Sequence, residues 1–327
     1  MVAMSEDANA TRSRDALRAA QLYYLQDRNM DAIANEMKIS RSSISRLLAY
    51  ARESGLVEIT VHSPQEAASH LTQRLGERYG VTVHVVPTRP RVTEAERLER
   101  TAMSAARILA MMADSNMVIG AAWGATLSAI ARNLPRKALH NSHVVQMNGA
   151  ANVETSGIGY AGEILDRFGR AFDARVHYFP VPALFDDPMT KQAMWRERSV
   201  RSVLDVQARV GLFVFGLGSP KADVPSHVYA GGYFTADDMH TLARYDVVGD
   251  CATVFYRGDG TPDGIPLNGR SSGPDFEAVK RIPHRLCVVS SESKLDALRG
   301  ALRAGIITDL VVEETVARRL SATVDAP

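Results

Sequence analysis

Residues 30–62 constrain the fold of this chain more than any other stretch, because they combine two short helical patterns, a tight turn and a strand (MDAIANEMKISRSSISRLLAYARESGLVEITVH). Apolar residues recur at helical spacing up to Gly55 and alternate with polar residues at 57–62. This order is typical of a winged helix-turn-helix, whose second motif helix enters the major groove of DNA. We predict such a domain over residues 14–62, preceded by a disordered tail at residues 1–13.

Each part of the motif has a predicted role. A first helix runs from about Arg14 to Asp27, and a second begins near Asp31, whose charge suits a helix N-terminus. Ile39 is expected to fill the turn as a hydrophobic plug. Ser40 is expected to cap the third helix, since its hydroxyl can accept a backbone N–H of the first turn.

The third helix presents a small, basic and hydrogen-bonding surface. Residues 38–52 contain four basic residues and no acid, whereas the whole chain has a net charge of only +1. Such a local basic helix suits binding to a phosphate backbone. A structural three-helix bundle with a solvated basic face is the alternative, but turn, cap, plug and wing together favour DNA binding. The predicted DNA-contacting residues are Ser40, Arg41, Ser42, Ser43, Ser45 and Arg46.

The composition is that of an ordinary globular protein with room for a small and a large domain in 327 residues. No run approaches the ~18 apolar residues of a transmembrane helix, and the N-terminus lacks the apolar core of a secretory signal. Cys251 and Cys287 are the two cysteines and lie far apart in the sequence. We therefore expect a cytoplasmic protein without a disulfide framework, metal site, cofactor or membrane partner.

The larger part of the chain has a different pattern. Residues 63–70 (SPQEAASH) are predicted to be a linker, and helical stretches alternate with apolar strands over residues 71–327. An extended strand is expected at 174–185 and one helix at 188–208. The alternation predicts an α/β domain with a mainly parallel sheet covered on both faces. Ligands of such sheets bind beyond the carboxyl ends of the strands.

Several turns at expected strand ends carry small or polar residues. The turn around Thr126 joins a buried strand to a helix N-terminus, where free backbone N–H groups favour an anion such as phosphate. Gln146 and Asn148 offer amides suited to sugar hydroxyls, and Lys294 could pair with a phosphate from the same sheet edge. Glycine turns are often plain chain reversals, and Trp123 is more often core than a sugar-stacking platform. Together, however, the turns predict a pocket for a polar ligand.

In these residues the chain resembles the SorC family of sugar-responsive bacterial transcriptional regulators. The resemblance covers nearly the whole chain, and the order of its segments is more specific than any one of them. It depends on the block AAQLYYLQDRNMDAIANEMKISRSSISRLLAYARESGLVEITVHSP, followed in order by VIGAAWGATL, VVQMNGA, FVFGLGS, VVGD and RIPHRLCVVSSESKLDALRGALRAGIITDLVVEETVARRL.

The resemblance implies a large domain with the fold of sugar-phosphate isomerases and amino-sugar-phosphate deaminases. It implies binding of a sugar phosphate, with a free sugar or polyol as the alternative, and dimers or tetramers on palindromic operators. Phosphate contacts are implied near Gly124, Thr126, Gly218, Ser219 and Lys294. Sugar contacts are implied near Gln146, Asn148, Gly149 and Asp250, with Trp123 beside them.

We therefore expect a DNA-binding regulator of a carbohydrate or polyol catabolic operon, whose operator affinity depends on the bound effector. The alternative is a sugar-phosphate isomerase or deaminase-like enzyme with Asp250 as base. The sequence places no second acid or histidine convincingly near Asp250, and an enzyme has no need of the N-terminal unit. A winged helix that binds protein instead of DNA is a third interpretation.

Overall fold

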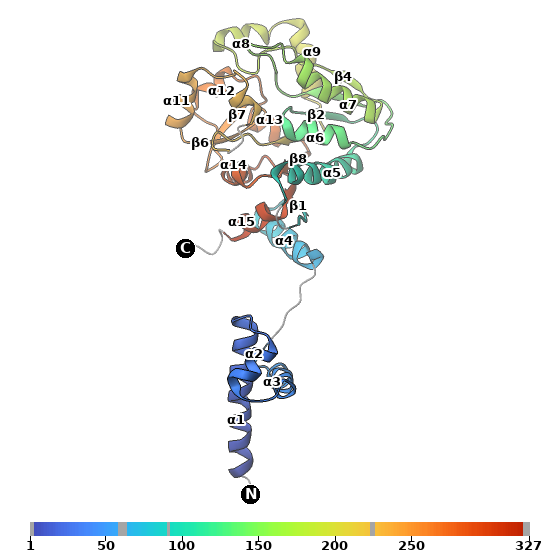
Figure 1. Cartoon of the computed structure of the whole chain (residues 1–327). Helices are drawn as coiled ribbons and strands as arrows, with labels where there is room; N and C mark the ends of the chain where they lie inside the picture. The colour runs from blue at the N-terminus through green and yellow to red at the C-terminus, as the bar shows by residue number, and fades with distance from the viewer. Residues whose placement is uncertain (1–2, 58–63, 90–91, 223–225, 323–327) are drawn as a thin grey trace. The chain divides into compact units, whose positions relative to one another are not determined.

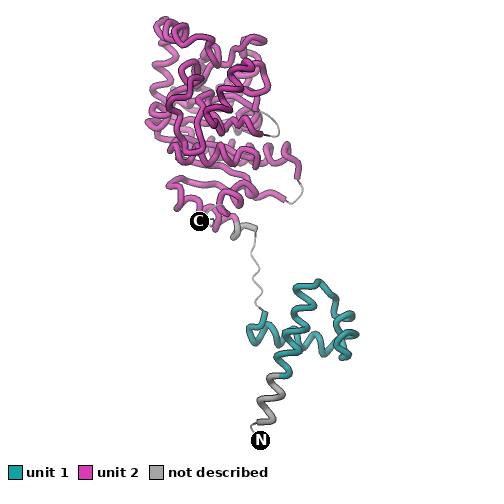
Figure 2. The backbone as a smooth tube through the Cα atoms, turned by 90° about the vertical axis from the view of Figure 1, so that its left-hand side faces the viewer, with its two compact units in different colours: residues 1–63 teal, residues 64–327 magenta. Residues whose placement is uncertain are grey.

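The structure, a computed structural model, describes residues 3–57, 64–89, 92–222 and 226–322 (Figure 1). The chain divides into two compact units, Met1–Ser63 and Pro64–Pro327 (Figure 2). The smaller unit contains the helix-turn-helix pattern and the larger unit contains the predicted α/β domain. Among the described residues, no helix is both long and apolar enough to cross a membrane.

The regular elements of the small unit are all helical over its described residues. Its elements are α1 (Ala3–Ala20), the π-helical turn η1 (Gln21–Leu25), α2 (Met30–Met37) and α3 (Arg41–Glu53). Lys38 ends α2 in the left-handed conformation, with φ of 55°. The Ser40 hydroxyl accepts the Ser43 N–H at 3.2 Å and caps α3, as predicted.

Two predictions for this unit need correction, and the predicted wing stays a prediction. The tail is helical from Ala3, because the residues before Arg14 contain neither proline nor glycine and continue the first helix. Ile39 is 38% exposed and is no plug, since the fully buried Ile33 and Ile44 already fill the space between α2 and α3. The wing at 57–62 lies outside the described residues except for its first position.

The large unit is built on a seven-stranded sheet in which every neighbouring pair is parallel, as predicted. The strand order is β1-β9-β8-β5-β2-β3-β4, so the last strand of the chain pairs with the first. The strands are β1 (Thr82–Val86), β2 (Val118–Ala121), β3 (His143–Gln146), β4 (Arg175–His177), β5 (Leu212–Gly216), β8 (His284–Val289) and β9 (Asp309–Glu313). An antiparallel ribbon of β6 (Val247–Cys251) and β7 (Val254–Arg257) stands apart from this sheet.

Helices cover both faces of the sheet (Figure 1). Side chains alternate along the strands: Val214 and Val288 point to one core cluster, while Phe213 and Cys287 point to the other. The first face is packed by α5 (Glu94–Met112), α6 (Ala125–Asn133) and α7 (Glu163–Phe172), the last preceded by η2 (Ile158–Gly162). The second face is packed by α4 (Pro64–Tyr79), α9 (Arg198–Gln207), α13 (Phe276–Lys280), α14 (Leu295–Arg303) and α15 (Glu314–Ala322).

The remaining short helices surround the ribbon and the sheet ends. They are α8 (Pro188–Met194), α10 (His227–Ala230), α11 (Ala236–Arg244), α12 (Pro266–Arg270) and the single 3₁₀ turn η3 (Glu292–Lys294). Cys251 and Cys287 are free thiols buried in the same core cluster. Their role is therefore apolar packing, and burial raises the pKa of both thiols.

Three further boundaries differ from the sequence-based expectation. The predicted linker at 63–70 is mostly helix, because α4 begins at Pro64, and proline is well suited to a first helical turn. The extended strand at 174–185 shrinks to β4, since Pro180 and Pro182 cannot donate ladder hydrogen bonds. The helix at 188–208 is broken near Trp195, whose ring packs against two buried phenylalanines, Phe179 and Phe185.

Candidate functional site

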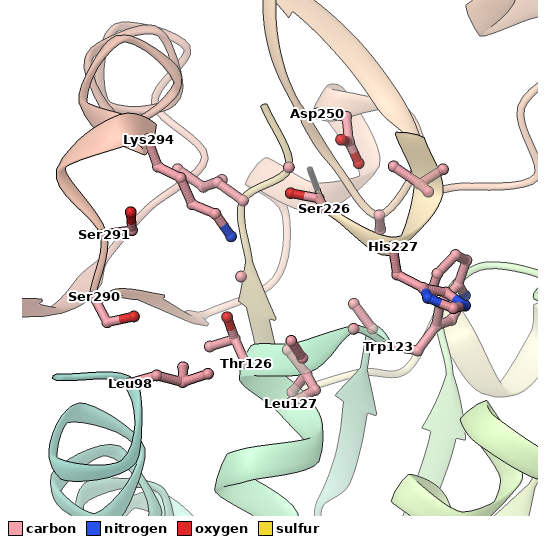
Figure 3. A pocket seen from close by; sticks show the side chains of 18 of the residues that line it. Leu98, Trp123, Thr126, Leu127, Ser226, His227, Asp250, Ser290, Ser291 and Lys294 are labelled. Carbon is pink, nitrogen blue, oxygen red and sulfur yellow. The ribbon is translucent and has the colours of Figure 1, made fainter. Parts of the chain in front are cut away.

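A cavity of about 340 Å³ lies at the carboxyl ends of the central strands (Figure 3). The first turn of α5 and the N-terminus of α6 form one side, and η3 and the β6–β7 ribbon contribute the other side. The cavity thus lies where the parallel sheet predicts a ligand site. Its polar or charged lining residues are Glu94, Trp123, Thr126, Asn148, Ser226, His227, Asp250, Thr253, Ser290, Ser291, Ser293 and Lys294.

The structure brings most of the predicted effector residues to this one cavity. Those that line it are Trp123, Gly124, Thr126, Asn148, Gly218, Asp250 and Lys294. The other three, Gln146, Gly149 and Ser219, are buried behind it and do not line it.

The N-terminus of α6 forms the anion-favouring end of the cavity. Gly124 precedes the helix with φ of 135°, a conformation that favours glycine, and gives it no side-chain cap. The first N–H groups of a helix have no partners within the helix, so they and the helix dipole attract negative charge. The Thr126 hydroxyl lies in the same first turn and is almost fully buried.

Lys294 is the cation of the cavity. Its amine points into the open space in Figure 3, and it has no hydrogen-bond partner among the described residues. Burial lowers the pKa of this amine, whereas the nearby Asp250, Cys287 and Glu94 act in the opposite direction. An anionic group on a ligand would restore to the ammonium group the partners that it lost with its water shell.

Asp250 lies opposite Lys294, where the ribbon meets the end of β5. Its Oδ2 atom accepts the N–H of Thr253 at 3.1 Å, while Oδ1 meets no donor in hydrogen-bond geometry among the described residues. The buried Tyr229 hydroxyl nevertheless lies close enough to the carboxylate to lower its pKa as a hydrogen-bond donor would. Burial raises the pKa of Asp250 to about 6, against the opposing effects of Tyr229, Thr253 and Lys294. The carboxylate is therefore costly to keep ionised at this buried position.

Gly218 makes room for this carboxylate. The backbones of Gly218 and Asp250 exchange two hydrogen bonds, of 2.9 and 3.2 Å. A Cβ atom at Gly218 would lie 1.8 Å from Asp250 Oδ1, so a larger residue would displace the carboxylate.

A second unpaired acceptor comes from Asn148. Its side chain is 2% exposed, and its Oδ1 atom has no partner among the described residues. Buried acceptors of this kind are costly unless a donor reaches them. Ligand hydroxyl groups are such donors, so Asn148 and Asp250 together suit a polyhydroxylated molecule.

Trp123 belongs to the cavity wall, but the protein already uses its polar edge. The indole N–H donates to the Gly149 carbonyl at 2.9 Å, and the ring stacks on Tyr233 with centroids 5.3 Å apart. His227 and Tyr160 pack beside it, their rings 4.7 Å apart. The wall is therefore an aromatic cluster held in place by the fold.

The three predicted residues outside the lining have supporting roles. Gln146 donates to the Asn148 carbonyl and accepts the N–H of Phe179, which fixes the turn after β3. Gly149 allows two backbones to approach closely, since a Cβ there would lie 2.2 Å from the Val181 carbonyl oxygen. Ser219 accepts an N–H of its own turn. Their positions in the turns could be predicted, but not the direction of their side chains.

Some lining residues were not predicted. Glu94 begins α5, and its carboxylate accepts the Ser291 hydroxyl at 2.9 Å, while Ser291 and Ser293 share a 2.8 Å hydrogen bond. The serine-rich segment before Lys294 offered a signal for the two serines. Glu94 and His227 come from segments outside the predicted strand-end turns, so no local pattern marked them.

A second candidate surface lies on α3 of the small unit. Of the six predicted residues, Ser43 is half-buried and the others are exposed. Arg46 donates weakly, at 3.4 Å, to the Ser42 carbonyl and to the Ser43 hydroxyl, and Arg41 lies 3.6 Å from Asp31. Both guanidinium groups remain largely in solvent, where they can exchange these contacts for phosphates or base edges.

The fold and the cavity define an α/β sensor domain joined to a small helical unit, and the comparisons place this arrangement in a family. The family described as "Putative sugar-binding domain" matches residues 63–321. The chain is 27% identical over 308 residues to the deoxyribonucleoside regulator of Bacillus subtilis (strain 168), covering 93% of this chain and 96% of that protein. It is 23% identical over 313 residues to the sorbitol operon regulator of Klebsiella pneumoniae, covering 95% and 99%.

Solved structures agree with this placement. A domain of a possible sugar-binding transcriptional regulator from Arthrobacter aurescens TC1 is 53% identical, with a TM-score of 0.74, and covers 80% of this chain and 100% of that one. The full-length sorbitol operon regulator SorC from Klebsiella pneumoniae, 22% identical, shares the fold with a TM-score of 0.72 over 94% of this chain and 99% of that one. The chain belongs to the SorC family of sugar-binding transcriptional regulators, as the resemblance predicted.

Proposed function

We propose that this protein is a DNA-binding transcriptional regulator of a carbohydrate or polyol operon, and that a sugar or sugar phosphate in the cavity controls its operator affinity. One observation carries the proposal. A single cavity combines an unpaired ammonium group on Lys294, the N-terminus of α6, and two unpaired acceptors on Asn148 and Asp250. These groups complement a molecule with one anionic end and several hydroxyls.

The DNA-binding part of the proposal is supported by α3. A capped helix that follows a short turn and bears exposed Arg41 and Arg46 has the form of a recognition helix. Palindromic operators present half-sites about one DNA turn apart, ~34 Å, which a single copy cannot read. We therefore propose a homo-oligomer, either a dimer or a tetramer, as the operator-binding species.

The effector part is tested by thermal-shift screening of the full chain. The panel contains C4–C6 sugars, alditols and their monophosphates. A specific compound at about 100 times its Kd should stabilise the protein by about 2.7 kcal/mol. Lys294→Gln and Asp250→Asn should each reduce that shift. A panel in which nothing stabilises the wild type, or in which both variants respond like the wild type, would contradict an effector site in this cavity.

The DNA-binding part is tested with Arg46→Ala in mobility-shift experiments on the DNA that lies upstream of the protein's own gene. Loss of an arginine that contacts a base or phosphate typically costs about 1–3 kcal/mol, so operator affinity should fall at least about fivefold while sugar binding is unchanged. Arg107→Ala, which removes an exposed arginine from α5 in the large unit, is the matched control. Equal operator affinities for wild type and Arg46→Ala would contradict the assignment of α3 as the helix that contacts DNA.

A further inference from the structure

The turn η3 has two functional sides. On one side Ser291, Ser293 and Lys294 line the cavity. On the other side the Glu292 carboxylate points away from the cavity, because its two oxygens contact arginines of two different helices. Any displacement of Lys294 must therefore move Glu292 as well, since both belong to one tight 3₁₀ turn.

Glu292 connects α5 to α15. Its Oε1 atom lies 3.2 Å from Nη1 of Arg97 on α5, and its Oε2 atom lies 2.6 Å from Nε of Arg319 on α15. Glu292 and Arg97 are about three-quarters buried, so their contact is only partly screened by solvent. The carboxylate thus bridges two helices that do not follow one another in the chain.

Arg97 also contacts residues at the end of β9 and the start of α15. The same Nη1 atom donates to the Thr315 hydroxyl at 3.0 Å and lies 3.9 Å from the fully buried carboxylate of Glu313. That carboxylate accepts the backbone N–H groups of Thr315 and Val316, the first turn of α15. Both arginines that contact Glu292 are therefore connected to α15: Arg319 belongs to this helix, and Arg97 contacts its first turn.

The helix α15 packs against α4, the first element after the small unit. Leu320 of α15 and Leu75 of α4 are fully buried in the same core cluster. Because α4 begins at Pro64, the first residue of the large unit, it is the element of that unit that follows the helix-turn-helix most closely in the sequence. A continuous series of contacts therefore runs from the cavity to the start of the large unit.

We propose that Glu292 is a positioning residue that couples occupancy of the cavity to α15 and α4, and thereby to operator affinity. The inference depends on the proposed function, because it explains how the effector site regulates DNA binding. An anionic group that pairs with the Lys294 amine in the cavity shifts η3, and the Glu292 carboxylate transmits that shift to both arginines. A salt bridge between rigid elements suits this role, since it has discrete made and broken states.

The test compares the full-length wild type with Glu292→Gln and Arg319→Gln. Arg318→Gln is the matched control, because Arg318 is the neighbouring arginine on α15 but pairs with Glu314 of its own helix. Ribose 5-phosphate, glucitol 6-phosphate and their dephosphorylated parents serve as probes. Probe affinity is measured by calorimetry, and operator affinity is measured with and without each probe.

We expect a probe to change the operator affinity of the wild type and Arg318→Gln about 5- to 150-fold, the usual range of allosteric coupling. Glu292→Gln and Arg319→Gln should bind the probe within about threefold of the wild type, while the change in operator affinity falls below about twofold. If Glu292 had a purely structural role, its substitution would not reduce the change in operator affinity while leaving the probe affinity intact. A full operator response in both variants overturns the coupling but leaves the proposed function standing.

Hydrogen exchange tests the connection even if no probe binds the wild type, a result that would count against the proposed effector class. The amides of residues 72–79 in α4 should exchange at least about threefold faster in Glu292→Gln and Arg319→Gln than in the wild type and Arg318→Gln. Equal exchange in all four proteins would show that Glu292 does not act on α4.

Discussion

The raised pKa of Asp250 leads to a prediction about stability. The carboxyl titrates at about 6 in the native protein, against an ordinary value of 3.8. A raised native pKa means that the native state binds the proton more tightly than the unfolded state. This contribution to stability is therefore fully present below the unfolded pKa and is lost as the pH rises through 6.

The size of the effect follows from these two values. At pH 7.5 neither state holds the proton, so the native protein bears the full cost of a buried charge. At pH 5.0 the native carboxyl is mostly protonated while the unfolded one is mostly ionised, which adds on the order of 1 kcal/mol to the free energy of unfolding. Asp250→Asn cannot titrate, and its side-chain oxygen can still accept the N–H of Thr253.

Urea denaturation of wild type and Asp250→Asn at pH 7.5 and 5.0 measures this difference. The variant should be the more stable protein at pH 7.5, and its advantage should shrink by on the order of 1 kcal/mol at pH 5.0. Asp237→Asn, an exposed first-turn carboxylate on α11, controls for the change in net charge. An advantage that is absent at pH 7.5, or the same at both pH values, would refute the assignment of a costly buried charge to Asp250.

Three other predictions concern the same cavity. Lys294→Gln should weaken the binding of a sugar monophosphate by about tenfold or more and that of the free sugar much less, as calorimetry would show; equal losses would argue against a phosphate contact. Gly149→Ala should lower the free energy of unfolding by at least about 1 kcal/mol, because a methyl group has no space beside the Val181 carbonyl. An unchanged melting temperature would contradict that close approach. The purified protein should leave sugar phosphates unchanged in a turnover assay, and any isomerised or deaminated product that is lost in Asp250→Asn would favour the enzyme alternative.

Much of the fold could be predicted because its signals are local. The apolar runs around Ile119, Val214 and Val288 predict buried parallel strands, and Ser40 predicts the start of α3. The exact ends of the helices and strands were harder to predict. Pro64 could be interpreted as a linker residue or as a first helical residue, and only the packing of α4 against α15 decides between the two.

The cavity residues were likewise predictable in part: the position of some in the sheet could be predicted, but not the direction of their side chains. Thr126 and Gly218 could be predicted to lie at one sheet edge, because they follow β2 and β5 and the carboxyl ends of parallel strands meet there. Asp250 reaches the same cavity from the antiparallel ribbon, which that rule does not cover. The direction of a side chain could not be predicted, since Gln146 turns to its own loop through the amide contact with Phe179. Glu94 reaches the cavity only through tertiary packing of α5, and no spacing in the sequence reports that contact.

The pairing of β1 with β9 has a consequence for synthesis. Thr82 is held opposite Asp309, so the first strand of the large unit cannot pair until nearly the last segment of the chain has left the ribosome. The helical unit, by contrast, can fold while the sensor is still being translated. A prematurely terminated chain would therefore carry the helix-turn-helix unit together with a sheet that lacks β9, and the effector control proposed for the large unit would be lost with that strand.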